Sequence, residues 1–311
     1  MHDTSILYDR ANAIWRNAGM NSSIAGSEVF IRRASPEDAL LCGQICYEAF
    51  TAINEQHRFP PDIPSAEVGA GFLQLLFGHP GFYCVVAEVD GEIVGSNCLD
   101  ERSAIAGVGP ITVRPGVQNR SVGRKLMRAV IDRSYERSFP GIRLVQAAFD
   151  NRSLSLYTKL GFDVREPLSV VQGPAIGKLP NGWKVRPASE ADLSATAQLC
   201  EAVHGHHRTG ELRDAIRQRT AFVAERDGRI TAYSSGLGFF GHAVAESNSD
   251  LKALLGTAEQ FSGPGILVPT RNSSLLRWSL ENGLRIVEPM TLMTIGLYNE
   301  PKGAYLPSIA F

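Results

Sequence analysis

Residues 111–128 read ITVRPGVQNRSVGRKLMR, and this stretch decides how the rest of the chain is interpreted. It opens with a β-branched run, turns at a Pro-Gly pair, and continues from Val122 into apolar residues at helical spacing. The pattern predicts a strand, a loop and a helix that begins near Ser121 and ends near Tyr135. The free N–H groups of the first helical turn favour phosphate binding, with Gly123 allowing close approach. An ordinary strand, loop and helix with solvated arginines is the alternative for this stretch alone, because glycine-containing loops are common.

Residues 118–123 resemble the acyl-CoA pyrophosphate loop of the GNAT superfamily of N-acyltransferases, Gln/Arg-x-x-Gly-x-Gly/Ala. Gln118 and Gly123 match, and Ser121 stands where the first glycine is expected. Serine keeps the backbone N–H and adds a hydroxyl that can bond to phosphate, although its Cβ narrows the allowed dihedrals. The resemblance implies that acyl-CoA contacts this loop and the strand before it, namely Ile111, Thr112, Val113, Gln118, Asn119, Arg120, Ser121, Val122, Gly123, Arg124 and Lys125.

A second block, FDNRSLSLYTKLGF from Phe149, resembles the GNAT signature Asn-x-x-Ala/Ser-x-x-Leu-Tyr-x-x-x-Gly-Phe. Ser153 and Tyr157 align with this signature. Asp150 stands at the usual asparagine position, and Asn151 follows one residue late. The resemblance implies that Asn151, Ser153 and Tyr157 also contact acyl-CoA.

Members of this family pass an acyl group directly from a thioester to an amine, so the resemblance implies an N-acetyltransferase that uses acetyl-CoA. Tyr157 is the expected general acid for the departing thiolate, and a core tyrosine bonded to backbone is the alternative. Residues 107–113 contain no carboxylate where many members place the general base, so the base is expected to be Glu101 or a water. Three further side chains are expected near the mouth through which the acceptor enters: Glu48, His57 and Asp100.

The departures from the family pattern support a second interpretation. Ser121, the shifted Asn151 and the missing carboxylate fit a non-catalytic acyl-CoA sensor or partner-binding module on the same scaffold. A nucleotide-phosphate enzyme is disfavoured because no Gly-Lys-Ser/Thr follows the loop. The acceptor itself, a small-molecule or peptide amine, is not determined by fold and cofactor.

Turn signals and short apolar runs between residues 28 and 168 predict the order β-α-α-β-β-β-α-β-α-β. Asp90-Gly91 predicts a hairpin between strands at residues 82–88 and 92–99, and residues 105–113 predict the next strand. This alternation indicates an α/β (α+β) fold with a mixed, mostly antiparallel twisted sheet flanked by helices. The elements and the two motif blocks together identify this region as a member of the GNAT superfamily.

The C-terminal half repeats the pattern in reduced form. Its middle, around Asp250, has no phosphate loop, and Ser279 stands where Tyr157 would be. We therefore predict two GNAT-like domains, the second a degenerate structural partner. The predicted boundaries are a polar extension at 1–27, a GNAT domain with the acyl-CoA site at 28–171, a linker at 172–182 and the degenerate domain at 183–311. Three blocks recur in the same order: Arg32, Ser35 and Asp38 as Arg186, Ser189 and Asp192; Glu88, Asp90 and Gly91 as Glu225, Asp227 and Gly228; Gly161, Glu166 and Pro167 as Gly283, Glu288 and Pro289.

Composition narrows the function classes. With 311 residues and a net charge of −1, the chain is long enough for two domains and has no global field that attracts nucleic acid or anionic lipid. Its five cysteines lie within apolar runs, which predicts buried free thiols in a reducing compartment. We expect a cytoplasmic protein, monomer or homodimer, with no metal site, no nucleic-acid partner and no membrane association.

Overall fold

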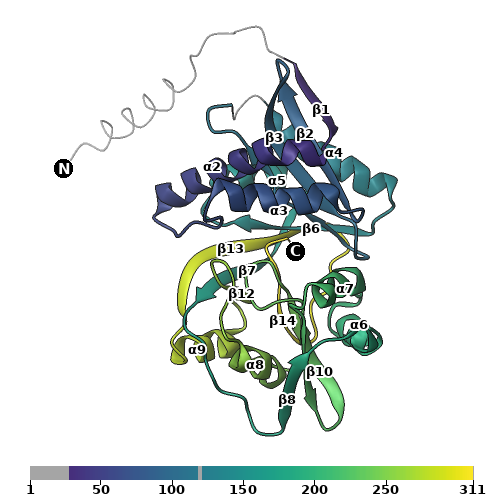
Figure 1. The fold of residues 1–311 in the computed structure, drawn as a ribbon, viewed down its shortest axis with the longest axis vertical. Helices are drawn as coiled ribbons and strands as arrows, with labels where there is room; N and C mark the ends of the chain where they lie inside the picture. The colour runs from purple at the N-terminus through teal and green to yellow at the C-terminus, as the bar shows by residue number, and fades with distance from the viewer. Residues whose placement is uncertain (1–27, 118–120, 311) are drawn as a thin grey trace, which may run out of the picture.

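The computed structural model describes residues 28–117 and 121–310 of the chain. The polar extension at 1–27 lies outside the described residues, as do Gln118, Asn119 and Arg120, which are predicted to contact acyl-CoA. Two lobes are stacked along the long axis of the molecule (Figure 1). The upper lobe is built mainly from residues 28–172, called the first half below, and the lower mainly from residues 173–310, the second half.

The first half follows the predicted order of elements, but the single strand predicted at residues 105–113 is wrong. It is divided into two short strands because Gly109 has a φ of 137° and Pro110 has no N–H to donate to a ladder. The elements are β1 (Val29–Arg33), η1 (Pro36–Asp38), α2 (Ala39–His57), α3 (Ala66–Gly78), β2 (Phe82–Val89), β3 (Glu92–Asp100), β4 (Ala106–Val108), β5 (Thr112–Val113), α4 (Val122–Glu136), β6 (Gly141–Ala147), α5 (Asn151–Lys159) and β7 (Asp163–Gln172).

The second half repeats this course with shorter elements. Its own five-stranded sheet has the order β14-β11-β10-β9-β8. The elements are β8 (Trp183–Pro187), η2 (Glu190–Asp192), α6 (Leu193–His204), α7 (Thr209–Arg217), β9 (Phe222–Arg226), β10 (Arg229–Ser234), β11 (Ala243–Ala245), α8 (Asn248–Thr257), β12 (Ile266–Pro269), α9 (Ser273–Glu281), β13 (Arg285–Gly296) and β14 (Ala304–Leu306).

The predicted hairpin is confirmed. Asp90 and Gly91 join β2 to β3 with φ values of 54° and 82°, the positive angles that a two-residue hairpin turn requires. Asp227 and Gly228 join β9 to β10 in the same way, with φ values of 53° and 76°. The repeat seen in the sequence is therefore also a repeat of turn geometry.

A shared polar network explains another repeated block. Arg32 pairs with Asp38 at 2.7 Å and also binds Glu88. Its counterpart Arg186 pairs with Asp192 at 2.7 Å and also binds Glu225. Each arginine thus ties the first strand of its half to the following helical turn and to the next strand. These repeated residues serve the fold rather than the chemistry.

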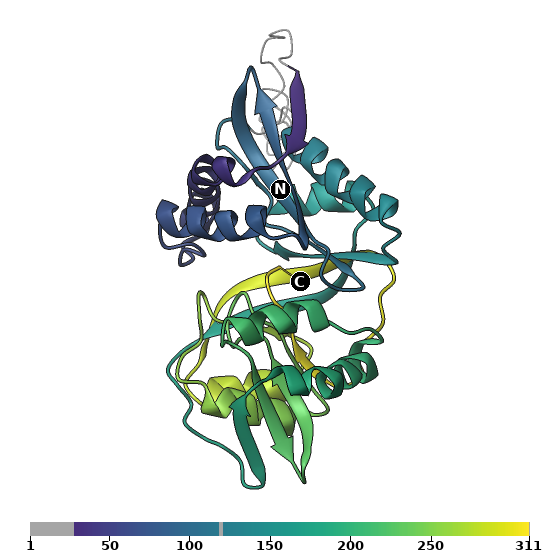
Figure 2. The ribbon, with the colours of Figure 1, turned by 45° about the vertical axis from the view of Figure 1, so that its right-hand side comes forward.

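Helices cover both faces of the first-half sheet (Figure 2). On one face lies α4, whose predicted apolar stripe is buried against alternate residues of β2 such as Val85 and Ala87. On the other face lie α2 and α3, which pack on Cys84 and Val86. The alternation along β2 follows from the two-residue period of a strand. It fixes α2 and α4, which both contribute to the cavity described below, on opposite sides of one sheet.

Gly43 of α2 sets the distance between α2 and α3. A Cβ at this position would overlap the backbone of Ala70 in α3. We expect Gly43→Leu to lower the free energy of unfolding by about 3 kcal/mol, because overpacking forces the helices apart. Chemical denaturation measures this change. Gly71→Ala in the same α3 is the control, because Gly71 has open space around it and alanine should stabilise the helix by about 0.5–1 kcal/mol. Equal stability of Gly43→Leu and the wild-type protein would contradict the close packing.

The two halves exchange strands. The larger sheet has the order β1-β2-β3-β4-β6-β13-β7-β12, with β5 pairing with β3. Strand β13 of the second half thus lies between β6 and β7 of the first, and β7 lies between β13 and β12. Leu168 pairs with Met290, and Ser169 on one side and Pro167 on the other pair with Pro289 and Thr291. Because the repeat superposes Pro167 on Pro289, the pairing is symmetric about the Leu168–Met290 pair.

The prediction that all cysteines are free is wrong for one pair. Cys84 and Cys98 form a disulfide because they face each other across β2 and β3, with their Cα atoms 4.1 Å apart. Cys42, Cys46 and Cys200 are free and buried.

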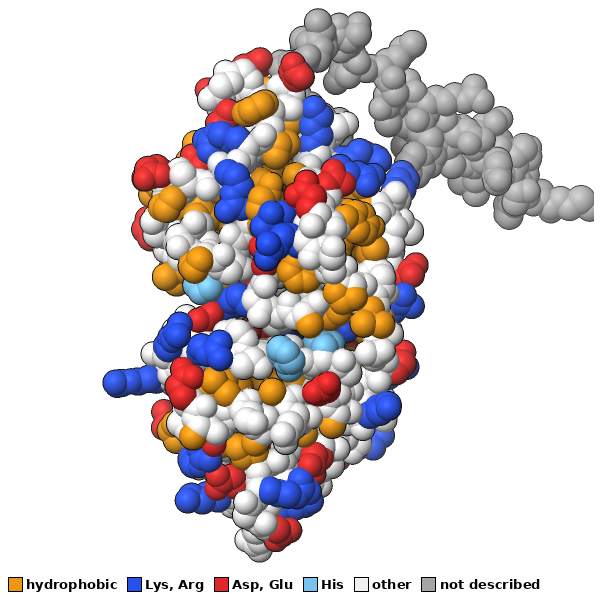
Figure 3. Space-filling model, turned by 90° about the vertical axis from the view of Figure 1, so that its right-hand side faces the viewer, with side chains coloured by type: hydrophobic (Ala, Val, Ile, Leu, Met, Phe, Trp, Pro, Cys, Tyr) orange, Lys and Arg blue, Asp and Glu red, His pale blue; other side chains and the backbone are white. Residues whose placement is uncertain are grey.

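Surface charges are mixed. Figure 3 shows Lys and Arg interspersed with Asp and Glu over the face that it presents. Within residues 28–117 and 121–310, no helix combines the length and the apolar character needed to cross a bilayer.

Candidate active site

One cavity of about 1000 Å³ lies where strands of the first-half sheet separate. Strand β4 pairs with β6 only through Ala106 and Gly107, and β5 turns away to pair with β3. Residues 111–113 on one side and residues 144–147 on the other therefore line an opening instead of bonding to each other. The starts of α4 and α5 and the end of α2 complete the walls.

Most of the residues predicted to contact acyl-CoA line this cavity, although their contact with it stays a prediction. Lys125 does not, because its ammonium donates a 2.9 Å hydrogen bond to the Val29 carbonyl in β1. The predicted residues along the cavity are Ile111, Thr112, Val113, Ser121, Val122, Gly123, Arg124, Asn151, Ser153 and Tyr157.

The start of α4 suits an anionic ligand. Ser121 precedes the helix in the left-handed region, with φ 65° and ψ 7°, a conformation that glycine adopts at lower cost. Its side chain makes no capping hydrogen bond, and the first turn contains no acidic residue. A Cβ on Gly123 would come no closer than 3.4 Å to Leu156, so packing alone does not require glycine there. These features leave the first-turn N–H groups to a phosphate, beside the Arg124 side chain at the cavity wall.

The start of α5 is held by Asp150. Its carboxylate accepts hydrogen bonds from the N–H groups of Arg152 and Ser153, at 3.0 and 3.2 Å. Gln146 of β6 donates a 3.0 Å hydrogen bond to the Ser153 hydroxyl. The residue at the usual asparagine position is therefore the helix cap, and Asn151 begins the helix at the cavity wall.

Tyr157 projects from α5 to the cavity with 7% of its surface exposed. Its ring packs edge-on against Phe162, with centroids 6.1 Å apart. Burial and the nearby charge of Asp150 raise the pKa of its phenol above the usual value. The phenol is therefore protonated at neutral pH and is available as a proton donor.

The carboxylates predicted to serve the acceptor lie elsewhere. Glu101 accepts two hydrogen bonds from the Arg133 guanidinium, at 2.7 and 3.1 Å, and is not among the residues that line the cavity. Glu48 accepts a hydrogen bond from Gln44 on α2 and does not line the cavity either. His57 does line it, and its ring lies 5.0 Å from that of Phe149.

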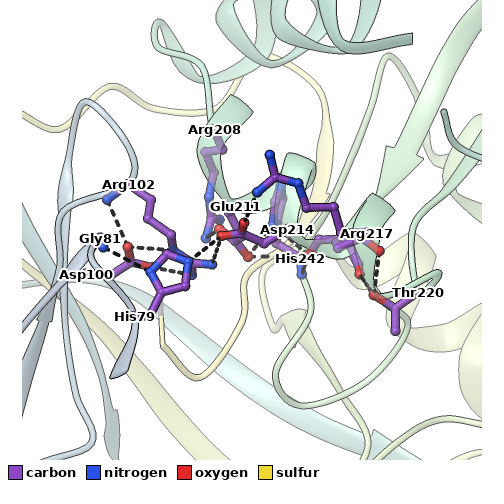
Figure 4. Close-up of polar contacts among 12 residues, drawn as sticks. His79, Gly81, Asp100, Arg102, Arg208, Glu211, Asp214, Arg217, Thr220 and His242 are labelled. Atoms are coloured by element: carbon purple, nitrogen blue, oxygen red, sulfur yellow. Dashed lines mark hydrogen bonds and ion pairs between the residues drawn. The ribbon is translucent and has the colours of Figure 1, made fainter. Parts of the chain in front are cut away.

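Asp100 belongs to a polar network between the halves (Figure 4). It pairs with Arg102 at 2.6 Å, and Arg102 reaches across to Asp214 of α7 at 3.0 Å. His79 contacts the same Asp214 carboxylate at 3.3 Å. This arrangement ties the lobes together and turns Asp100 away from the cavity lining.

Sequence reasoning missed the side of the cavity formed by the loop between α2 and α3 and by the second half. The loop residue Asp62 lines it, and so do Phe239, Phe240 and Met290 of the second half. The pattern contains one signal that could have directed attention there: Glu288, two residues before Met290, is the repeat counterpart of Glu166. No sequence pattern indicates that β13 crosses to the first half.

The second half offers no equivalent helix start. At α8, the Ser247 side chain accepts from the N–H of Asp250, whose carboxylate occupies the first turn. Asp250 in turn binds the Trp183 indole N–H at 3.0 Å. Ser279, at the position of Tyr157, donates to the Leu275 carbonyl within its own helix. The protein's own side chains thus fill the place of an anionic ligand.

Comparisons with known proteins agree with this geometry. Residues 46–162 match the family model described as the acetyltransferase (GNAT) family. No curated protein sequence matches the chain. Among solved structures, a candidate acetyltransferase from Pyrococcus horikoshii is similar over 91% of this chain and 96% of its own, with 20% identity and a TM-score of 0.70.

Two further structures share the two-lobed fold. A GCN5-related N-acetyltransferase from Sphaerobacter thermophilus is 16% identical over 88% of this chain and 96% of its own, with a TM-score of 0.57. A tandem GNAT protein from the clavulanic acid biosynthesis pathway is 15% identical over 86% of this chain and 98% of its own, with a TM-score of 0.55. The chain has the fold of a tandem GNAT protein, and its residues 46–162 match the model of the acetyltransferase (GNAT) family.

Proposed function

We propose that the chain is an N-acetyltransferase that moves an acetyl group from acetyl-CoA to an amine. The observation that carries this proposal is the cavity of about 1000 Å³, which joins the uncapped start of α4 to the Tyr157 phenol. A helix start can bind the pyrophosphate of acetyl-CoA, and a buried proton donor can protonate the departing thiolate.

Bound acetyl-CoA supplies the thioester whose carbonyl carbon the amine attacks. In our proposal, the start of α4 and Arg124 hold the pyrophosphate, while Asn151 and Ser153 lie along the pantetheine. Tyr157 gives its proton to the sulfur as the carbon–sulfur bond breaks. The proposed domains are those expected from the sequence, with the second half supporting the first rather than binding a second acetyl-CoA.

Calorimetric titration with acetyl-CoA tests the proposed site. We expect one molecule per chain, and we expect Gly123→Asp to weaken binding at least about 100-fold because its carboxylate would face the pyrophosphate. The same carboxylate favours a helix N-terminus, so thermal stability should not fall. Gly123→Ala is the control and should bind more tightly than Gly123→Asp, because it adds bulk without charge. Two molecules per chain, or unchanged affinity in Gly123→Asp, would contradict the assignment.

A further inference from the structure

Two carboxyl groups meet at the acceptor side of the cavity. Asp62, in the loop between α2 and α3, lines the cavity, and the carboxyl of Glu288 of β13, a residue that is 1% exposed, lies beside that of Asp62. The two residues come from different halves of the chain. They meet only because β13 lies beside β6.

The direction of Glu288 follows from its strand. Glu288 and Met290 are two residues apart on β13, so their side chains point to the same face of the sheet. Met290 lines the cavity, and the neighbouring Pro289 carbonyl accepts from the Ala148 N–H at the end of β6. Glu288 is therefore directed toward the cavity side, with Asp62 between it and the open space.

No cationic side chain of the described residues accompanies this pair. The groups that act on the Asp62 carboxyl are Asn54 and Glu288, and Asp62 in turn lies close to the Cys46 thiol of α2. Both Glu288 oxygens are buried without a donor from the described part of the chain other than Asp62. Its repeat counterpart Glu166 is bound instead by Arg271, at 2.6 Å.

Burial sets the charge of the pair. Burial raises the pKa of both carboxyls, and the Asp62 charge raises that of Glu288 further. Protonated Glu288 then donates a hydrogen bond to ionised Asp62, and the pair carries one negative charge. A single buried negative charge with no cation from the chain is complementary to one ammonium group.

The walls around this charge are apolar. Phe72 of α3 and Phe240 of the second half approach across the cavity with centroids 5.0 Å apart, and Phe50 and Phe239 line the same region. The basic side chains along the cavity belong instead to α4 and α5, at the proposed acyl-CoA end: Arg124, Arg152 and Lys159. Within residues 28–117 and 121–310, the acceptor end thus presents no Lys or Arg side chain to pair with a carboxylate on the substrate.

We propose that Asp62, held by Glu288, binds the ammonium group of an apolar primary amine that carries no carboxylate, and takes the proton that this amine must lose. This inference rests on the proposed acetyl transfer in the same cavity. Asp62 is the catalytic residue, and Glu288 is a positioning residue that acts through it. The second half would then supply part of the acceptor site.

The proton balance closes with these groups. A primary amine is protonated at neutral pH, and one of its protons passes to Asp62. The nitrogen lone pair forms the C–N bond, the carbon–sulfur bond breaks, and Tyr157 protonates the sulfur. The second proton lost by the nitrogen restores Tyr157. The proton on Asp62 leaves to solvent, so each turnover yields an amide, a thiol and one proton.

Thiol release from acetyl-CoA with three amines tests the acceptor class. We expect 2-phenylethylamine to be acetylated, and L-phenylalanine and spermidine to show at least about 10-fold lower kcat/KM. The carboxylate of L-phenylalanine would meet no cation at the acceptor end and would be repelled by Asp62. The additional ammonium groups of spermidine would meet no second negative charge there. Acetyl-CoA affinity is measured separately by calorimetry. No binding of acetyl-CoA would overturn the proposed function itself, whereas binding without acetylation of 2-phenylethylamine would overturn only the acceptor class.

Variants separate the two carboxyls. Asp62→Asn should lower kcat/KM for 2-phenylethylamine about 100-fold and leave the Kd of acetyl-CoA unchanged. Glu288→Leu removes the hydrogen bond to ionised Asp62, which raises the pKa of Asp62 and moves the acid limb of the kcat/KM profile to higher pH. Glu288→Gln can still donate and should keep the wild-type profile.

Glu166→Gln is the matched control, because Glu166 is the repeat counterpart of Glu288 but is bound to Arg271. The acid limb of the kcat/KM profile of Glu166→Gln should lie at the wild-type pH, even if this variant is less stable. Wild-type kcat/KM in Asp62→Asn would overturn the proposal. The proposal would also be overturned if the acid limb of the kcat/KM profile fell at the same pH in Glu288→Leu and Glu288→Gln. A carboxyl pair with a purely structural role predicts that result.

Discussion

Tyr157→Phe is expected to lower kcat for acetyl transfer at least about 100-fold, the usual contribution of a positioned acid or base. The change removes one oxygen from a side chain that burial keeps protonated, and it leaves the ring packed on Phe162. Acetyl-CoA affinity should therefore be unchanged by calorimetry. Initial rates of thiol release with saturating acetyl-CoA and 2-phenylethylamine measure the loss.

Tyr135→Phe is the control for this experiment, because Tyr135 lies exposed on α4 away from the cavity lining. Its rate should equal that of the wild-type protein. Full activity in Tyr157→Phe would remove this tyrosine from the mechanism. If the wild-type protein binds acetyl-CoA but acetylates no amine, the non-catalytic sensor would be the better interpretation of the same cavity.

Glu211→Gln is expected to lower the free energy of unfolding by about 3–5 kcal/mol, because it removes the buried carboxylate that pairs with Arg208. Glu211 pairs with Arg208 at 2.5 Å and accepts a 2.8 Å hydrogen bond from His242 (Figure 4). Arg208 is only 6% exposed, so water cannot replace the lost carboxylate. Urea denaturation followed by circular dichroism measures the loss.

The pair of Arg213 and Glu190 provides a surface control. Their side chains are 43% and 58% exposed and 3.7 Å apart, so Glu190→Gln should change stability by less than about 1 kcal/mol. If Glu211→Gln behaves the same way, the buried network does not stabilise the fold as argued.

The acid dependence of stability gives a second measurement of Glu211. Although burial opposes its charge, Arg208 and His242 hold the folded-state pKa of Glu211 below the ordinary value of about 4.5 for a glutamate. A lowered folded-state pKa means that the stabilisation is complete above about pH 4.5 and declines as the pH falls further. Glu211→Gln should therefore flatten the stability profile below that pH.

Local signals in the sequence were sufficient for local structure. The Asp90-Gly91 turn, the apolar stripe of α4 and the motif tyrosine on α5 depend on neighbouring residues, and the structure shows each element as predicted. Gly109 and Pro110 divide the predicted strand at residues 105–113 into β4 and β5. The sequence pattern does not reveal this division, because apolar residues continue on both sides of the Gly-Pro pair.

The acceptor side depends on contacts that no local pattern contains. A two-residue period identifies β13 as a strand but not the strand with which it pairs. Its place between β6 and β7 is decided by packing of the whole molecule, and only that place brings Glu288 to Asp62. The prediction of Glu101 as the general base rests on its place directly after β3. Its ion-pair partner Arg133, on α4, is distant in sequence, so no local pattern indicates that pair.

The placement of β13 beside β6 and β7 also limits which mutations and deletions the chain can tolerate. Strand β13 of the second half pairs with β6 and β7 of the first, so a deletion of the second half would leave β6 with an unpaired edge where β13 now lies. Ser279 of α9, at the position of Tyr157 in the repeat, donates a hydrogen bond within its own helix and does not line the cavity. Mutational tolerance should therefore differ sharply between α8 and α9, which do not line the cavity, and β13, whose Met290 does.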